Sequence, residues 1–299
     1  MTNQLKISAA DLGTNTLKVT HATRLNGGEL ADMVHASDTV RLGFNLGKTG
    51  NIEEHRIEDC LHFLKEQEAI GRGYGAEAFV GVATEALRVA GNGADLIDRI
   101  HAETGWSIEV ISGNREAELT YLGLADQVPN GVDCAIVDIG GGSTEIVEIK
   151  DGKVELIQSL AVGSGRLSDR YFESDPPGKD SVQDAIDAAT ESLKTLLEHD
   201  IACGFVMLAG GSGLFMNMLI QQLWSEPPFD AITLKRLADH LSVVKAEDTV
   251  SRIAIPHARA LVLPASVAVG VAIMNQFQAQ QAIGVPSGIR MGLIREYAP

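Results

Sequence analysis

The sequence predicts an α/β protein of two domains, each built on a mixed sheet, and three observations lead to this prediction. The chain has 299 residues, which is more than one hydrophobic core usually covers. Strand-like and helix-like segments alternate along it, and an antiparallel hairpin opens each half. The turns at residues 11–16 and 138–143 begin alike, with Asp, an apolar residue and Gly. We therefore expect duplicated domains, 1–125 and 126–299, that face each other across a cleft, with the last helix able to pack back on the first domain.

The first half is expected to alternate between strands and helices. Apolar, β-branched runs predict strands at 5–10, 17–21, 78–83 and 107–111. Capping residues followed by apolar residues at helical spacing predict helices that begin at Asn51, after Thr84, after Asn92 and near Arg115. The last of these helices has Glu116 in its first turn. A turn at residues 129–131, Pro-Asn-Gly, marks the boundary between the halves.

The second half repeats this organisation. We expect strands at 133–138, 144–149, 153–160 and 205–209. A long amphipathic helix at 181–200 is expected to place four residues in the core, namely Ile186, Leu193, Leu196 and Leu197. The apolar run at 260–274 is shorter than the ~20 residues that span a bilayer. It predicts a buried helix with Pro264 in its first turn, where a missing N–H is tolerated.

Composition excludes several classes of protein. The net charge of −16 argues against general nucleic-acid binding, which needs a basic face. A local basic surface can still bind a polyanion, because charges farther away than roughly 8 Å are screened. Residues 1–10 lack a signal-peptide pattern, and the three cysteines and eight histidines show no metal-ligand spacing. We expect a reduced, cytoplasmic protein with no membrane or nucleic-acid partner, and base rates for soluble enzymes predict a homodimer.

The glycine-rich turn at 138–143 points to phosphate chemistry. Glycine allows positive φ, and without Cβ atoms the amides of Gly140 and Gly141 can approach an anion directly. Asp138 would hold a cation against the bound phosphate. An ordinary glycine-rich hairpin explains this stretch equally well. The related turn at 11–16 favours phosphate binding, because duplicated halves would each supply a loop.

Several strings in the sequence resemble one known family. They are D-L-G-T-N-T at 11–16, V-R-L-G at 40–43, A-T-E-A-L-R at 83–88, I-S-G-N-R-E-A at 111–117 and D-I-G-G-G-S-T-E at 138–145. In this order they are similar to the exopolyphosphatase and guanosine pentaphosphate phosphohydrolase family, in its short two-domain form. The resemblance implies two ribonuclease-H-like domains of the actin-like ATPase superfamily, with mixed sheets and an interdomain cleft.

The resemblance also implies roles for individual residues. Glu116 matches the general base, and Asp11 and Asp138 match ligands of Mg²⁺, with Mn²⁺ as the alternative ion. The positions implied to bind phosphate are Thr14, Asn15, Arg41, Arg88, Gly140, Gly141 and Ser143. Each has a structural alternative: a first-turn glutamate for Glu116, turn caps for the aspartates, and surface ion pairs for the arginines. For Arg41 the two interpretations are equal, and Lys48 and Arg166 are weaker candidates for a basic track.

The implied function is metal-dependent hydrolysis of terminal orthophosphate from inorganic polyphosphate. Guanosine pentaphosphate is the alternative substrate. A kinase of the same fold is a rival from another enzyme class, and no Walker-type lysine loop supports a P-loop enzyme. A third possibility is a non-catalytic polyphosphate or alarmone sensor, because Leu261 and Met291 stand where the family commonly has acidic residues.

Overall fold

The computed structural model describes residues 4–224, 228–286 and 288–298, and the chain divides into two compact units. The first unit comprises Met1–Asp126 and Ser287–Pro299, and the second comprises Gln127–Pro286. Each unit contains one five-stranded mixed sheet. The predicted class, two α/β units with mixed sheets, is confirmed.

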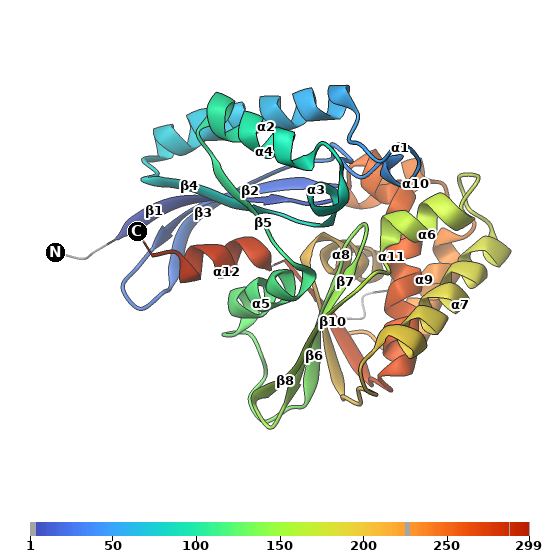
Figure 1. Cartoon of the computed structure of the whole chain (residues 1–299). Coiled ribbons are helices and arrows are strands. Elements are labelled where there is room, and N and C mark those ends of the chain that lie inside the picture. The colour runs from blue at the N-terminus through green and yellow to red at the C-terminus, as the bar shows by residue number, and fades with distance from the viewer. Residues whose placement is uncertain (1–3, 225–227, 287, 299) are drawn as a thin grey trace. The chain divides into compact units, whose positions relative to one another are not determined.

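The sheet of the first unit has the order β3-β2-β1-β4-β5. Its strands are β1 (Leu5–Leu12), β2 (Leu17–Arg24), β3 (Leu30–Asp38), β4 (Ala78–Ala83) and β5 (Ser107–Val110). The first three strands pair antiparallel, and β1, β4 and β5 run parallel. The helices are α1 (Leu46–Thr49), α2 (Glu54–Tyr74), α3 (Glu85–Val89), α4 (Gly93–Thr104), α5 (Gly113–Leu124) and α12 (Ile289–Glu296). Helices α2 and α4 cover one face of this sheet, and α5 and α12 cover the other (Figure 1).

The sheet of the second unit has the order β10-β9-β6-β7-β8, which read from β8 repeats the topology of the first. Its strands are β6 (Cys134–Ile139), β7 (Thr144–Lys150), β8 (Lys153–Leu160), β9 (Phe205–Ala209) and β10 (Gln281–Val285). Its helices are α6 (Ser164–Tyr171), α7 (Lys179–Leu196), α8 (Gly210–Trp224), α9 (Ala231–Leu241), α10 (Ala246–Ile253) and α11 (His257–Gln276). The expected duplication of the hairpin-led sheet is therefore confirmed.

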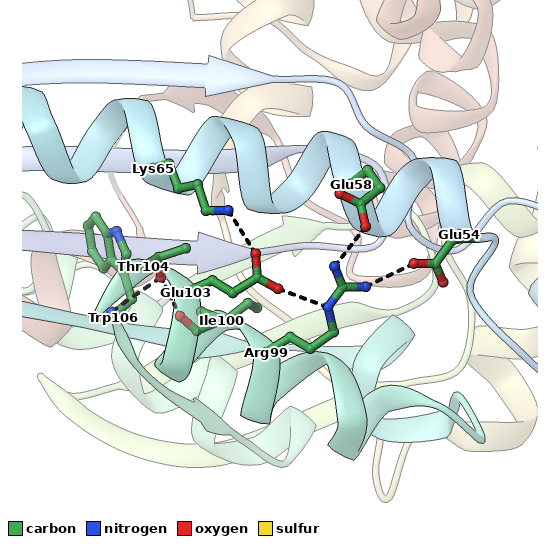
Figure 2. A network of polar contacts seen from close by, with 8 residues as sticks. All are labelled: Glu54, Glu58, Lys65, Arg99, Ile100, Glu103, Thr104 and Trp106. Atoms are coloured by element: carbon green, nitrogen blue, oxygen red, sulfur yellow. Dashed lines mark hydrogen bonds and ion pairs between the residues drawn. The ribbon is translucent and has the colours of Figure 1, made fainter.

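Polar contacts join the two helices that cover the first sheet (Figure 2). Arg99 of α4 forms ion pairs with Glu54 and Glu58 of α2 at 2.9 and 2.7 Å, and with Glu103 of its own helix at 3.0 Å. Below this exposed network, the buried Trp106 donates its indole N–H to the Leu64 carbonyl at 3.0 Å. These contacts fix α4, and with it the strand β5 that leads to α5.

The local expectations for helix ends need correction at three places. Helix α2 begins at Glu54, three residues after Asn51, and neither Thr84 nor Asn92 caps its helix with its side chain. The Asn92 amide instead donates to the Ile52 carbonyl and accepts from the Ile52 N–H, both at 2.9 Å. Tertiary hydrogen bonding therefore outcompetes local capping. In α7, Leu196 is 44% exposed and lies outside the core.

Helix α11 is longer than its apolar run suggested. It spans His257–Gln276, so Pro264 lies in the helix interior and not in the first turn. The missing N–H is tolerated because residues on every side of the helix are buried against the core of the second unit. Among the described helices, α11 alone is long and apolar enough to cross a membrane, and 78% of its apolar window is buried inside the protein. Its burial is that of a core helix, as predicted.

Candidate active site

Two hairpin loops have the same backbone pattern in the two units. We call residues 13–16, between β1 and β2, the first loop, and residues 140–143, between β6 and β7, the second loop. The Gly13 N–H donates to the Thr16 carbonyl at 3.2 Å, and the Gly140 N–H donates to the Ser143 carbonyl at 2.9 Å. Each loop follows an Asp and one apolar residue, so Asp11 and Asp138 occupy equivalent positions.

The glycines serve close approach and not the positive φ expected from the sequence. Gly13 and Gly140 lie outside the left-handed region. A Cβ on Gly140 would lie 2.9 Å from the Ser143 carbonyl oxygen, and one on Gly13 would lie 2.9 Å from that of Thr16. The turns are tight because these backbone atoms touch. Only glycine fits at this distance without moving the loop.

The predicted residues of the first unit gather at one edge of its sheet. Strands β1, β4 and β5 are parallel neighbours, so their carboxyl ends meet there. The Thr84 N–H donates to the Leu12 carbonyl at 3.2 Å, and the Ile111 N–H donates to the Ala83 carbonyl at 3.0 Å. The end of β1 supplies Asp11, and the segments after the three strands supply the first loop, Arg88 on α3 and Glu116 on α5. Open α/β sheets bind ligands at this edge.

Glu116 lies in the first turn of α5 and is buried. Ser112 caps the helix by accepting the Arg115 N–H at 3.2 Å. The Arg115 side chain donates to Glu296 and Glu118, and hydrogen bonding to Glu296 raises the pKa of its guanidinium. The positive end of the helix dipole favours a carboxylate here, while burial keeps Glu116 from bulk water. Glu116 is thus a buried carboxylate at a helix N-terminus beside the carboxyl ends of β1, β4 and β5.

The arginines are held differently. Arg88 donates to the Ile111 carbonyl at 2.6 Å, which fixes its guanidinium at the end of β5. Arg41 has a φ of 56°, in the left-handed region that a side chain rarely adopts. Its N–H donates to the Asn15 carbonyl at 2.9 Å, and its guanidinium lies 4.8 Å from the centre of the Phe44 ring. The first loop therefore determines where Arg41 sits.

The first loop contains buried donors that lack acceptors within the part of the chain described. Asn15 Nδ2 and Thr16 Oγ1 make no hydrogen bond there, although Asn15 is only 7% exposed. A buried polar group without a partner is costly and rare. Beside this loop, the Gly43 N–H donates to the Thr14 carbonyl at 2.9 Å, so the segment from Arg41 to Gly43 lines the same loop. An anion at this position would accept the Asn15 and Thr16 donors.

The second loop rests on the start of α6. The Ser164 N–H donates to the Gly140 carbonyl at 2.9 Å, and the Gly165 N–H donates to the Gly141 carbonyl at 2.8 Å. Gly163 packs so closely below the loop that a Cβ there would lie 2.6 Å from the Gly142 carbonyl carbon. Ser143 is buried at the end of the turn. The start of α6 therefore holds the Gly140 and Gly141 carbonyls, and the Gly140 N–H closes the turn on the Ser143 carbonyl.

Two further residues of the second unit join this site, and the sequence reasoning did not single them out. Glu145 pairs across the hairpin with Asp138, so both carboxylates lie on one face of the sheet. Ser159 donates to one Glu145 oxygen at 2.7 Å. Arg259, at the start of α11, is buried; burial lowers the pKa of its guanidinium, and Asp138 raises it. The hairpin register points to Glu145 from sequence, whereas nothing local marks Arg259.

Glycines leave room around these groups. A Cβ on Gly210 would lie 2.9 Å from Asp138 Oδ1, and one on Gly211 would lie 2.9 Å from Arg259 Nη2. The string at 210–213 thus opens space beside a carboxylate and an arginine where α8 begins. Oxygen donors with space between them suit Mg²⁺. Within the described residues, no group of three or more His, Cys, Asp or Glu side chains is arranged to hold a metal.

Known proteins resemble this chain in sequence. The model of the Ppx/GppA phosphatase family matches residues 22–299. The chain is 29% identical over 205 residues to Exopolyphosphatase 1 of Mycobacterium bovis, and the aligned region covers 65% of this chain and 58% of the relative. It is 29% identical over 182 residues to Exopolyphosphatase 1 of Mycobacterium leprae, and this aligned region covers 58% of the chain and 52% of the relative. The chain thus spans little more than half the length of these relatives.

Solved structures agree in fold over nearly the whole chain. The Aquifex aeolicus member of the Ppx/GppA family superposes with a TM-score of 0.78 at 25% identity, covering 98% of this chain and 97% of that one. An exopolyphosphatase from Cytophaga hutchinsonii has a TM-score of 0.84 at 22% identity, covering 97% and 96%, and shows the fold alone. Because the family model matches most of its length, this chain belongs to the Ppx/GppA phosphatase family.

Proposed function

We propose that this protein is a metal-dependent phosphohydrolase that removes terminal orthophosphate from inorganic polyphosphate. The observation that carries the proposal is the equivalent pair of loops, each preceded by an aspartate, together with Glu116 at the sheet edge that holds the first loop. Membership of the family, and the exopolyphosphatases among the mycobacterial relatives, support hydrolysis of a phosphoanhydride.

The residues at the first sheet edge fit the demands of phosphoryl transfer, in which positioning and charge neutralisation do most of the work. Glu116 accepts a proton from the attacking water. Asn15 Nδ2 and Thr16 Oγ1 have no hydrogen-bond partner in the described structure and donate to phosphate oxygens. Arg88 and Arg41 offer guanidinium groups that match a phosphate in shape and charge.

In the second unit, the Gly141 N–H and the Ser143 hydroxyl bind phosphate, while the predicted Gly140 N–H donates to the Ser143 carbonyl and holds the turn. Arg259 adds a buried cation that interacts with Asp138 and donates a long hydrogen bond of 3.5 Å to Ser212 Oγ. Of the two predicted metal ligands, Asp138 has the Glu145 carboxylate beside it, so we place the ion there. Bound Mg²⁺ would neutralise charge on the phosphate oxygens.

The state of the cysteines supports a proposal for the cellular compartment. Cys60, Cys134 and Cys203 are free and buried, and burial raises the pKa of Cys60 to about 12 and that of Cys203 to about 11. Unreactive free thiols fit the cytoplasm, which we propose as the location. The homodimer stays a prediction. Its test is the molar mass of the protein measured by light scattering as it elutes from a size-exclusion column.

The test is orthophosphate release from long-chain polyphosphate, from guanosine pentaphosphate and from ATP, each with Mg²⁺. Glu116→Gln is expected to lower kcat by about 10²–10⁴-fold, the usual contribution of a general base, while polyphosphate still binds. Glu118→Gln is the matched control, because Glu118 lies on the same helix with its side chain 46% exposed. Full activity of Glu116→Gln would remove the base assignment.

The three substrates separate the remaining functions. Release from guanosine pentaphosphate alone would keep the chemistry and change the substrate. ADP formation that requires an acceptor would indicate the kinase. Tight binding of polyphosphate without release under Mg²⁺ or Mn²⁺ would make the protein a sensor.

A further inference from the structure

The two hairpins have the same register around their aspartates, and the residue opposite each aspartate carries opposite charge in the two units. In the first unit, Asp11 pairs across the hairpin with Lys18, which pairs with Ser37 on β3. In the second unit, Asp138 pairs with Glu145, which pairs with Ser159 on β8. The aspartate and the serine are kept, and the residue between them is a lysine in one unit and a glutamate in the other.

The reversed position is in contact with the aspartate. Lys18 Nζ lies 3.4 Å from Asp11 Oδ2, and Asp11 is only 5% exposed. Directly opposed residues of an antiparallel pair share one face with their Cβ atoms about 4.5–5.5 Å apart, so Glu145 is placed against Asp138 in the same way. The first sheet edge therefore has one carboxylate neutralised by an ammonium group, and the second has two carboxylates.

Resting on the proposed function, we infer that the Lys18 ammonium group is a built-in cation at the first sheet edge and stands in for a divalent ion there. A divalent ion then binds at Asp138 and Glu145 and not at Asp11, so each chain holds one catalytic ion and one fixed charge. Arg259 near Asp138 leaves this second edge with a net negative charge, whereas the pair at the first edge is neutral. Asp11 thus pairs with Lys18 instead of ligating metal.

The experiment is titration of the full chain with Mn²⁺, with free ion measured by electron paramagnetic resonance. One tight site per chain is expected. Asp138→Asn should weaken it by at least about tenfold, the lower end of what losing a supporting group of a metal site costs. Asp11→Asn should leave stoichiometry and Kd within about twofold of wild type. The binding readout does not depend on turnover.

Reciprocal charge swaps make the test decisive. Lys18→Glu gives the first edge the carboxylate pair of the second and should add a second Mn²⁺ site. Glu145→Lys gives the second edge the ion pair of the first and should abolish the original site. If a swap variant fails to fold by circular dichroism, Asp11→Asn alone decides the question.

Several results would overturn the inference. Two Mn²⁺ ions on the wild type, one of them lost in Asp11→Asn, would show that Lys18 leaves room for metal. A single site weakened tenfold by Asp11→Asn would make Asp11 a ligand. Phosphate release without any bound Mn²⁺ would contradict the inference but would still support the proposed hydrolysis. Conversely, one ion at Asp138 without phosphate release would support it while the proposed reaction fails.

Discussion

Replacing Gly163 by Ala tests whether the second loop depends on its close support. Gly163 has φ of −149° and ψ of 161°, a conformation open to any residue, so the change acts through contacts alone. The added Cβ would lie 2.6 Å from the Gly142 carbonyl carbon and 2.7 Å from the carbonyl carbon and oxygen of Gly141. All three are backbone atoms, so no side chain can rotate away.

The size of the effect follows from the displacement. Ordinary contact begins at 3.4 Å, so the loop and the start of α6 must separate by about 0.8 Å. Forcing extra volume into a packed site costs about 1–3 kcal/mol, and each kcal/mol lowers Tm by about 2–4 °C in a unit of this size. A misplacement of about 1 Å costs on the order of 10²-fold in rate. We expect a folded variant with kcat/KM on polyphosphate reduced by about that factor.

The assay pairs phosphate release with thermal unfolding. Gly204→Ala is the matched control, because Gly204 lies in the same unit and a Cβ there meets no atom within 4 Å. It should change neither quantity. If Gly163→Ala keeps kcat/KM within about twofold of wild type, the second loop does not bind the reacting phosphate in the geometry described.

Three further predictions concern the first unit. Gly292→Ala places a Cβ 1.9 Å from the Leu119 carbonyl oxygen, where α12 packs on α5. The free energy of unfolding should fall by about 3 kcal/mol or more, and turnover should fall because the helix that carries Glu116 shifts. Gly73→Ala, in open space on α2, is the control and should raise the free energy of urea unfolding by up to about 1 kcal/mol. Burial lowers the pKa of His21 from 6.5, so the folded protein prefers the neutral ring. The contribution of His21 to stability is therefore full above pH 6.5 and is lost as the pH falls toward the lowered pKa. The pH dependence of the urea unfolding midpoint should be weaker in His21→Gln than in wild type. Arg99→Ala removes three exposed ion pairs, so Tm should fall slightly at low salt and match wild type near about 1 M NaCl; a difference that persists at high salt would contradict this account.

The alternation of strands and helices was readable because it is a local property. Strands β4, β8 and β9 have the predicted ends, since apolar β-branched runs bounded by turns leave few other conformations. The repeated Asp-apolar-Gly turn also predicted the duplication, because a hairpin and its register are encoded within a few residues. The family strings located Glu116, Arg88 and both loops in the chain.

Other features depended on groups that are distant in sequence. The capping roles of Thr84 and Asn92 failed because Leu12 and Ile52 offer their side chains tertiary partners. The reason for Gly140 is steric contact with Ser143, which φ preferences do not contain. Pro264 sits inside α11 because burial on all sides outweighs one lost hydrogen bond.

The class of fold, the duplication and the positions of the two hairpin loops could be predicted from the sequence, because each depends on short-range patterns of polarity and glycine. Tertiary structure alone decided which charges meet. It set Lys18 against Asp11 and Glu145 beside Asp138, and it buried Arg259 near Gly211. Electrostatic interaction depends on distance and burial, and strand pairing and helix packing fix both only when the chain folds.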